Sequence, residues 1–192
     1  MTMTHNEVFN RQAIVMNIPL VYEGRELPSK LQAKLMIMRV TYDKAVEAFR
    51  AKMQEVAKGL KSKGYDELEA EINKMYTAEN KEKAYKEWNG EGEKPAEPTK
   101  EELDEAKKIR AEKFDDYEAK KSALLAKLNE AYAQEGETQS DIKVKKFTEE
   151  EYAEIIEMIK TEGTIKYTNA HGNVLEIPKV VFFGLIAADL VE

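Results

Sequence analysis

The sequence predicts a mainly α protein, in which a long helical hairpin or short coiled coil is accompanied by a minor β component. Three observations lead to this prediction: one long apolar stripe at helical spacing, a linker rich in glycine and proline, and a β-hairpin pattern near the C-terminus. The composition agrees, since 35% of the residues are charged, against about 25% in an average domain. Long solvated helices expose more surface than a compact globule and therefore carry more charge.

The first element is predicted to be extended. Residues 12–22 (QAIVMNIPLVY) are apolar and rich in β-branched side chains, and Pro19 lacks the amide that a central strand would need. We therefore expect an N-terminal extended segment or edge strand here. The pair Glu23-Gly24 indicates a turn, and Ser29 is a candidate N-cap for the helix that follows.

The strongest structural signal is an apolar stripe on one helix of roughly 30 residues, about 45 Å long. Its members follow one another at spacings of three or four residues, which is typical of a buried helix face or a heptad seam. They are Leu31, Leu35, Met38, Tyr42, Ala45, Phe49, Met53, Val56 and Leu60.

Two further helices are predicted to form a charged antiparallel hairpin. The first covers residues 66–88, and residues 89–98 (NGEGEKPAEP) form the linker. The second runs over residues 99–135, beginning with a capping box made by Thr99 and Glu102.

The last fifty residues mix the two kinds of structure. The alternation in 141–147 (DIKVKKF) predicts a strand, and Thr148 with Glu151 forms a second capping box that opens a short helix. Residues 164–168 and 174–177 flank a five-residue turn and predict a β-hairpin. The apolar run 180–188 is compatible with either helix or strand.

This pattern predicts three parts. Residues 1–64 contain the extended segment and the long helix, residues 65–136 form the helical arm, and residues 137–192 form a small α/β part. We expect the first and last parts to make one domain, with the N-terminal segment and the C-terminal hairpin sharing one sheet.

The charges are segregated along the chain, although the total is only −7. Residues 1–64 hold 11 basic and 6 acidic side chains, whereas residues 65–105 hold 6 basic and 14 acidic ones. Parts of opposite sign favour docking within the chain or head-to-tail contact between copies. The chain has no cysteine, no signal-peptide pattern and no run of about 18 apolar residues, so we expect a soluble cytoplasmic protein without a membrane span.

The residues that usually carry catalysis or bind metal ions are scarce. His5 and His171 are the only histidines, and neither has the spacing of a catalytic triad. The pair Gly90 and Gly92 lies in an acidic loop that lacks the lysine of a phosphate-binding loop. The sequence therefore predicts a protein that is not an enzyme and has no cofactor and no metal site.

The candidate functional residues are instead apolar side chains that a partner would bury. They come from the long helix, from the only tryptophan and from the apolar C-terminal run: Leu31, Leu35, Met38, Tyr42, Phe49, Met53, Trp88, Phe182 and Phe183. Tryptophan is common at interaction hot spots.

The leading functional hypothesis is a structural or assembly protein that forms homo-oligomers or joins a larger assembly through helical contacts, for example as a phage virion component. The alternative is a regulatory adaptor or inhibitor that binds one cellular protein through the helical arm. A second alternative is a nucleic-acid-associated protein that uses the basic first helix. This second alternative is the least favoured of the three hypotheses because the whole chain is acidic, with a pI near 5.2.

Overall fold

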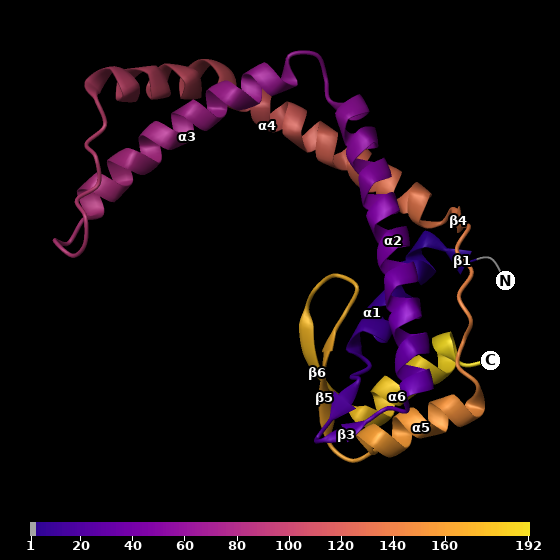
Figure 1. Ribbon diagram of the computed structural model, residues 1–192. Helices are drawn as coiled ribbons and strands as arrows, with labels where there is room; N and C mark the ends of the chain where they lie inside the picture. Colours follow the sequence, from indigo (N-terminus) through magenta and orange to yellow (C-terminus); the bar gives the residue numbers. More distant parts are fainter. Residues whose placement is uncertain (1–2) are drawn as a thin grey trace. The chain divides into compact units, whose positions relative to one another are not determined.

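The computed structural model describes residues 3–192 and shows a mainly α protein with a minor β component (Figure 1). The described residues form six helices and three two-stranded antiparallel sheets. They divide into two compact units, which we describe separately. Unit 1 comprises the chain up to Met53 together with Tyr132–Glu192, and unit 2 comprises Gln54–Ala131.

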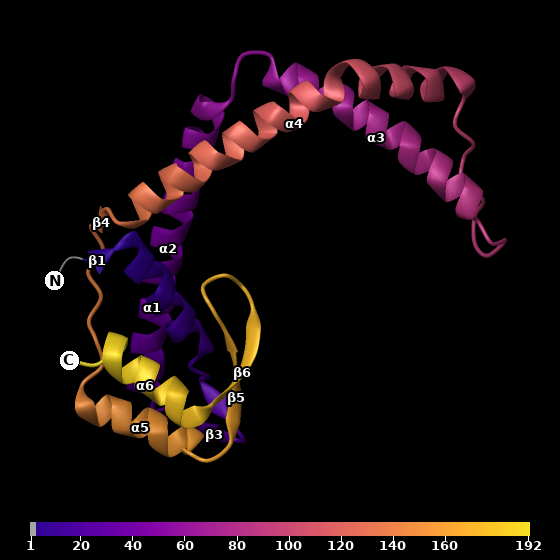
Figure 2. The same ribbon diagram turned by 180° about the vertical axis from the view of Figure 1, so that it is seen from behind.

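Four helices build the core of unit 1. These are α1 (His5–Asn17), the first part of α2 (Ser29–Leu60), α5 (Glu149–Ile159) and α6 (Lys179–Leu190). In Figures 1 and 2, α1, α5 and α6 gather around α2. Side chains that are completely buried come from all four helices and from the segments that join them: Val15, Ile18, Leu35, Phe147, Ile155, Ile159, Phe182, Ile186 and Leu190.

The strand pairs lie at the edges of this core. β1 (Met3–Thr4) pairs with β4 (Gln139–Ser140), and β2 (Val21–Tyr22) pairs with β3 (Arg25–Glu26). The turn at Glu23-Gly24 is confirmed. Both of its residues have positive φ, 48° and 77°, as a two-residue hairpin turn of matching twist requires.

The predicted C-terminal hairpin is also confirmed. β5 (Thr164–Thr168) pairs with β6 (Val174–Pro178), with Ile165 opposite Ile177. The Asn169 side chain accepts hydrogen bonds from the amides of His171 and Asn173, both at 3.0 Å, and so closes the loop.

The prediction of an extended segment at residues 12–22 was wrong for residues 12–17, which are helical, and holds at Val21–Tyr22, which form β2. Thr4 and Glu7 form a complete capping box, which starts α1 at His5 and carries the helix to Asn17. Pro19 lies just beyond the C-cap residue Ile18, where proline ends a helix without breaking one. The apolar β-branched residues therefore form the buried face of a helix.

Two further expectations about β structure were wrong. Residues 141–147 form no strand, and of these seven described residues only Phe147 makes a β-bridge, to Val191. The N-terminal residues and the C-terminal hairpin do not share a sheet, because each strand pair is separate. The undecided apolar run at 180–188 is helical and belongs to α6.

Unit 2 contains the antiparallel helical hairpin that the sequence predicts. α3 (Tyr65–Glu87) packs against α4 (Lys100–Gly136), which belongs to unit 2 as far as Ala131. The capping box of Thr99 and Glu102 is present. The buried residues of the two helices are Tyr65, Leu68, Ile72, Met75, Ala78, Ala106, Ile109, Tyr117 and Leu124.

Ion pairs connect the two helices of unit 2 outside this apolar row. The Arg110 guanidinium donates two hydrogen bonds to the Glu79 carboxylate, at 2.7 and 2.6 Å. Those bonds hold the pKa of Glu79 below its ordinary value, although partial burial opposes the effect. Lys81 pairs with Glu102 at 2.8 Å. These charges are therefore paired between the two helices of the unit.

Candidate functional site

Most of the apolar residues predicted to meet a partner are buried in their own chain. The six that come from α2 are at most 4% exposed: Leu31, Leu35, Met38, Tyr42, Phe49 and Met53. The first four of these belong to the same core cluster as Phe182 and Phe183 of α6. In this conformation that face of α2 is covered by helices of unit 1 and is closed to any partner.

Trp88 is different, because 38% of its surface is exposed. It follows the last residue of α3 in unit 2, where its indole Nε1 donates a hydrogen bond to the carbonyl of Glu91 at 3.2 Å. The Lys94 ammonium lies 5.7 Å from the centre of the indole ring. The side chain is thus held in a defined position and remains accessible.

The opposite face of α2 carries apolar side chains that nothing in the described chain covers. Met36 is 45% exposed, Ile37 is 67% exposed and Val40 is 48% exposed. They belong to residues 35–40 (LMIMRV), which are apolar on nearly every side of the helix. A helix segment of this kind is normally covered on both faces. These three residues lie outside the apolar stripe from which the interaction residues of α2 were predicted.

A groove of about 570 Å³ lies between α2 and the segment 143–145, and we call it the α2 groove; of the three exposed side chains, only Ile37 lines it. Its apolar lining includes Ala33, Ile37 and Val144, and Glu151 of α5 lies at its border. Four lysines also line it: Lys30, Lys34, Lys143 and Lys145. The α2 groove therefore combines an apolar floor with a rim that is positively charged overall.

Only one of the four lysines is neutralised. The Lys34 ammonium lies 2.5 Å from Glu151 Oε2. Burial raises the pKa of Glu151, but the hydrogen bonds from Lys34 and from the Thr148 backbone outweigh it and hold that pKa below its ordinary value. Within residues 3–192, the other three lysines form no ion pair. The rim thus retains about three unpaired positive charges.

The segment that forms one wall of the α2 groove has free backbone groups. Among the described residues, the amides and carbonyls of 143–145 make no backbone hydrogen bond, although neighbouring Phe147 bonds to Leu190 at 2.7 Å. The side chains of Lys143 and Lys145 are exposed, and Val144 is half-buried towards the groove. Unpaired extended backbone is able to bond to another chain.

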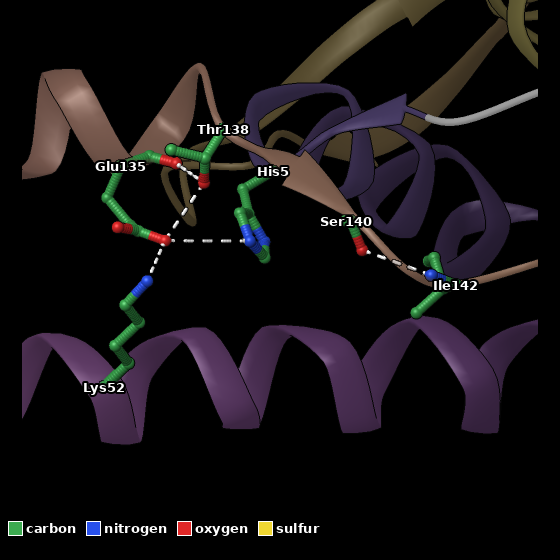
Figure 3. A network of polar contacts seen from close by, with 6 residues as sticks. All are labelled: His5, Lys52, Glu135, Thr138, Ser140 and Ile142. Atoms are coloured by element: carbon green, nitrogen blue, oxygen red, sulfur yellow. Dashed lines mark hydrogen bonds and ion pairs between the residues drawn. The ribbon is translucent and has the colours of Figure 1, made fainter.

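A second polar cluster joins the start of α1, α2 and the end of α4 within unit 1 (Figure 3). Lys52 lies 2.5 Å from Glu135 Oε1, and the Thr138 hydroxyl lies 3.0 Å from the same oxygen. Figure 3 also shows Ser140, whose hydroxyl accepts a hydrogen bond from the Ile142 amide at 3.5 Å.

This cluster does not have the geometry of a histidine–carboxylate catalytic pair. His5 Nε2 is 3.9 Å from Glu135 Oε1, which is too far for a hydrogen bond, and His5 Nδ1 is buried without a partner. The imidazole packs against the Phe49 ring at 5.0 Å. His171 is exposed in the hairpin loop, and no group of three metal-ligating side chains occurs in the part of the chain that the structure describes.

Acidification is expected to destabilise the protein through this cluster. The hydrogen bond from Lys52 lowers the pKa of Glu135, burial opposes it, and the Thr138 hydroxyl adds to the lowering. Because the folded pKa lies below the unfolded value of about 4.3, the stabilisation is complete above that pH and is lost as pH falls through the folded pKa. The pKa values of Glu79, Glu102, Glu150 and Glu151 are also lowered, so their contributions have the same sign.

Urea unfolding followed by circular dichroism at pH 6 and pH 3 measures this dependence. The free energy of unfolding should be smaller at pH 3, and Glu135→Gln should reduce the difference between the two values. Equal free energies at both pH values would contradict the expectation.

No helix among residues 3–192 is long and apolar enough to cross a membrane. Comparison of the chain with protein families, curated proteins and solved structures finds no match.

Proposed function

We propose that this chain is a non-enzymatic assembly protein that associates with copies of itself through the α2 groove. The observations that carry the proposal are the exposed apolar side chains Met36, Ile37 and Val40 of α2, and the unpaired lysines around the groove that Ile37 lines. In this proposal the protein works in the cytoplasm or, if a phage encodes it, as a component of the virion.

Burial of these side chains supplies part of the driving force for association. Complete burial of an aliphatic side chain stabilises by roughly 1.5–3 kcal/mol, and these three are about half exposed to begin with. Burial of their exposed halves therefore contributes about 2–5 kcal/mol, which reaches only the lower end of the 4–15 kcal/mol that association costs in lost freedom. Pairing of the rim lysines with an acidic surface would supply the remainder and orient the contact.

A copy of the same chain offers such an acidic surface. Residues 65–105 carry a net charge of −8, whereas residues 1–64 carry +5. Charge segregation of this kind favours contacts between unlike parts of different copies over contacts between like parts. It also predicts that added salt weakens the association.

Nucleic-acid binding is the second candidate, and the unpaired rim lysines favour it. Against it, several basic residues of α2 are already engaged: Arg39 donates to the carbonyls of Val15 and Ile18, and Lys52 pairs with Glu135. An apolar groove floor also offers nothing to a phosphate backbone. A mobility shift of DNA or RNA that disappears in Lys143→Glu, without any self-association, would favour this candidate over assembly.

The test is the solution mass measured by light scattering at several concentrations and two salt levels. The wild-type chain should form an oligomer whose mass rises with concentration and falls with salt. Ile37→Glu should raise the dissociation constant by about tenfold or more, equivalent to about 1.4 kcal/mol. Leu125→Glu is a matched control, because Leu125 is also exposed, at 50%, but lies in unit 2 on α4.

Three outcomes are decisive. A larger dissociation constant for Ile37→Glu alone supports the proposal. An equal effect of Leu125→Glu would show that any added charge disrupts association. A monomer under all conditions would overturn the proposal and favour the adaptor alternative, in which the exposed Trp88 binds a different protein.

A further inference from the structure

We propose that the α2 groove of one copy binds the acidic loop at residues 87–97 of a second copy, with Trp88 inserted beside Ile37 and Val144. This inference rests on the proposed self-association and adds the identity of the bound segment. We call residues 87–97 the Trp88 loop.

The Trp88 loop is acidic and its charges are free. It contains Glu87, Glu91, Glu93 and Glu97 against a single basic residue, Lys94, so its net charge is −3. All five side chains are exposed, and in the described part of the chain none of the four carboxylates forms an ion pair. The net charge of the loop is therefore opposite in sign and equal in size to the charge of the three unpaired lysines at the rim of the α2 groove.

The loop also presents its apolar side chain in a fixed position. The indole of Trp88 bonds to the Glu91 carbonyl, and the Glu91 amide donates to Asn89 Oδ1 at 3.1 Å. The Lys94 ammonium lies over Tyr85 at 4.8 Å as well as over Trp88. A side chain that is already ordered loses little entropy when it is buried by a partner.

The volume and the lining of the groove suit an indole. The groove has a volume of about 570 Å³, and Ala33, Ile37 and Val144 supply an apolar lining. Tryptophan buries a large apolar area while its ring nitrogen keeps a hydrogen bond, which explains its frequency at interaction hot spots. Lysines around the opening would pair with the glutamates on either side of Trp88.

The contact joins two different surfaces, because the groove belongs to unit 1 and the Trp88 loop belongs to unit 2. Each copy has one α2 groove and one Trp88 loop. A contact between unlike surfaces either repeats along a row of copies or occurs twice across a two-fold axis. In both arrangements every Trp88 engaged in the assembly is buried.

Tryptophan fluorescence tests the contact in the full-length chain, since Trp88 is the only tryptophan. Its emission should move to shorter wavelength as protein concentration rises and the oligomer forms. The groove variant Lys143→Glu/Lys145→Glu should remove this shift, and Trp88→Ala should raise the dissociation constant by roughly tenfold or more.

Exchange of charge provides the specific test. The groove variant and the loop variant Glu91→Lys/Glu93→Lys should each associate weakly alone, and an equal mixture should recover wild-type affinity because the reversed charges match again. The control Glu112→Lys/Asp115→Lys makes the same change of charge at exposed residues of α4 and should not complement the groove variant.

The outcomes separate this inference from the proposed function. If the chain self-associates and Ile37→Glu weakens it, but the emission does not shift and the mixture does not recover, the proposed function stands and this inference is wrong. A monomer at every concentration overturns both. Emission at short wavelength that does not change with concentration would mean that Trp88 is buried within its own chain, which also overturns the inference.

Discussion

Phe182→Ala is expected to lower the free energy of unfolding of unit 1 by about 3–5 kcal/mol. Phe182 is completely buried in α6, and its ring lies 6.1 Å from that of Tyr167 and 6.2 Å from that of Phe183. Removal of the ring leaves a cavity that these neighbours fill only in part. A domain is stable by only about 5–15 kcal/mol, so the loss is a large share of the total.

Urea unfolding followed by circular dichroism measures the effect. Val181→Ala is the matched control, because Val181 lies next to Phe182 in the same helix but is 49% exposed. The control should change stability by about 0.5 kcal/mol or less. Similar losses in the two variants would show that α6 is not packed as the structure describes.

In α6 the sequence pattern does not determine the secondary structure. Residues 180–188 are apolar on every side, so neither a helical period nor a strand period stands out, and only the packed structure shows a helix. By contrast, α2, α3, α4 and α5 could be predicted because a stripe or a capping box marks each of them. Thr99 with Glu102 and Thr148 with Glu151 place two helix starts almost to the residue.

The error at α1 has a specific physical cause. The apolar run from Ala13 to Ile18 is rich in β-branched side chains, which favour strands in isolation. The signal for a helix was the pair Thr4 and Glu7, which precedes the predicted extended segment and was not recognised as a capping box. Packing against α2 then outweighed the local preference, as tertiary contacts commonly do.

The α2 groove could be predicted only in part. The all-round apolar character of residues 35–40 was visible in the sequence and indicates a face that needs a cover. The other wall comes from residues 143–145, more than a hundred positions away, and they read as a strand. Nothing in a single sequence shows that two such distant segments lie side by side, so the four lysines could not be assigned to one rim.

Ile72→Ala in α3 is the second large effect, a loss of about 2–5 kcal/mol confined to unit 2. Ile72 is completely buried in a cluster whose buried residues come from α3 and α4, with Leu60 of α2 packed against them. Exposed ion pairs such as Arg110 with Glu79 are screened by water and contribute little, so they cannot replace the lost packing.

Trp88 fluorescence reports unfolding of unit 2, and hydrogen exchange of the α6 amides reports unit 1. The Ile72→Ala variant should shift the fluorescence transition to lower urea and leave exchange in α6 unchanged, whereas Asn73→Ala, at the adjacent exposed position, should shift neither. If both probes moved together, the two units would unfold as one cooperative structure. If only the fluorescence transition moves, unit 2 unfolds independently of unit 1. At urea concentrations that unfold unit 2 alone, self-association should then be weaker, because the Trp88 loop is no longer held between two packed helices.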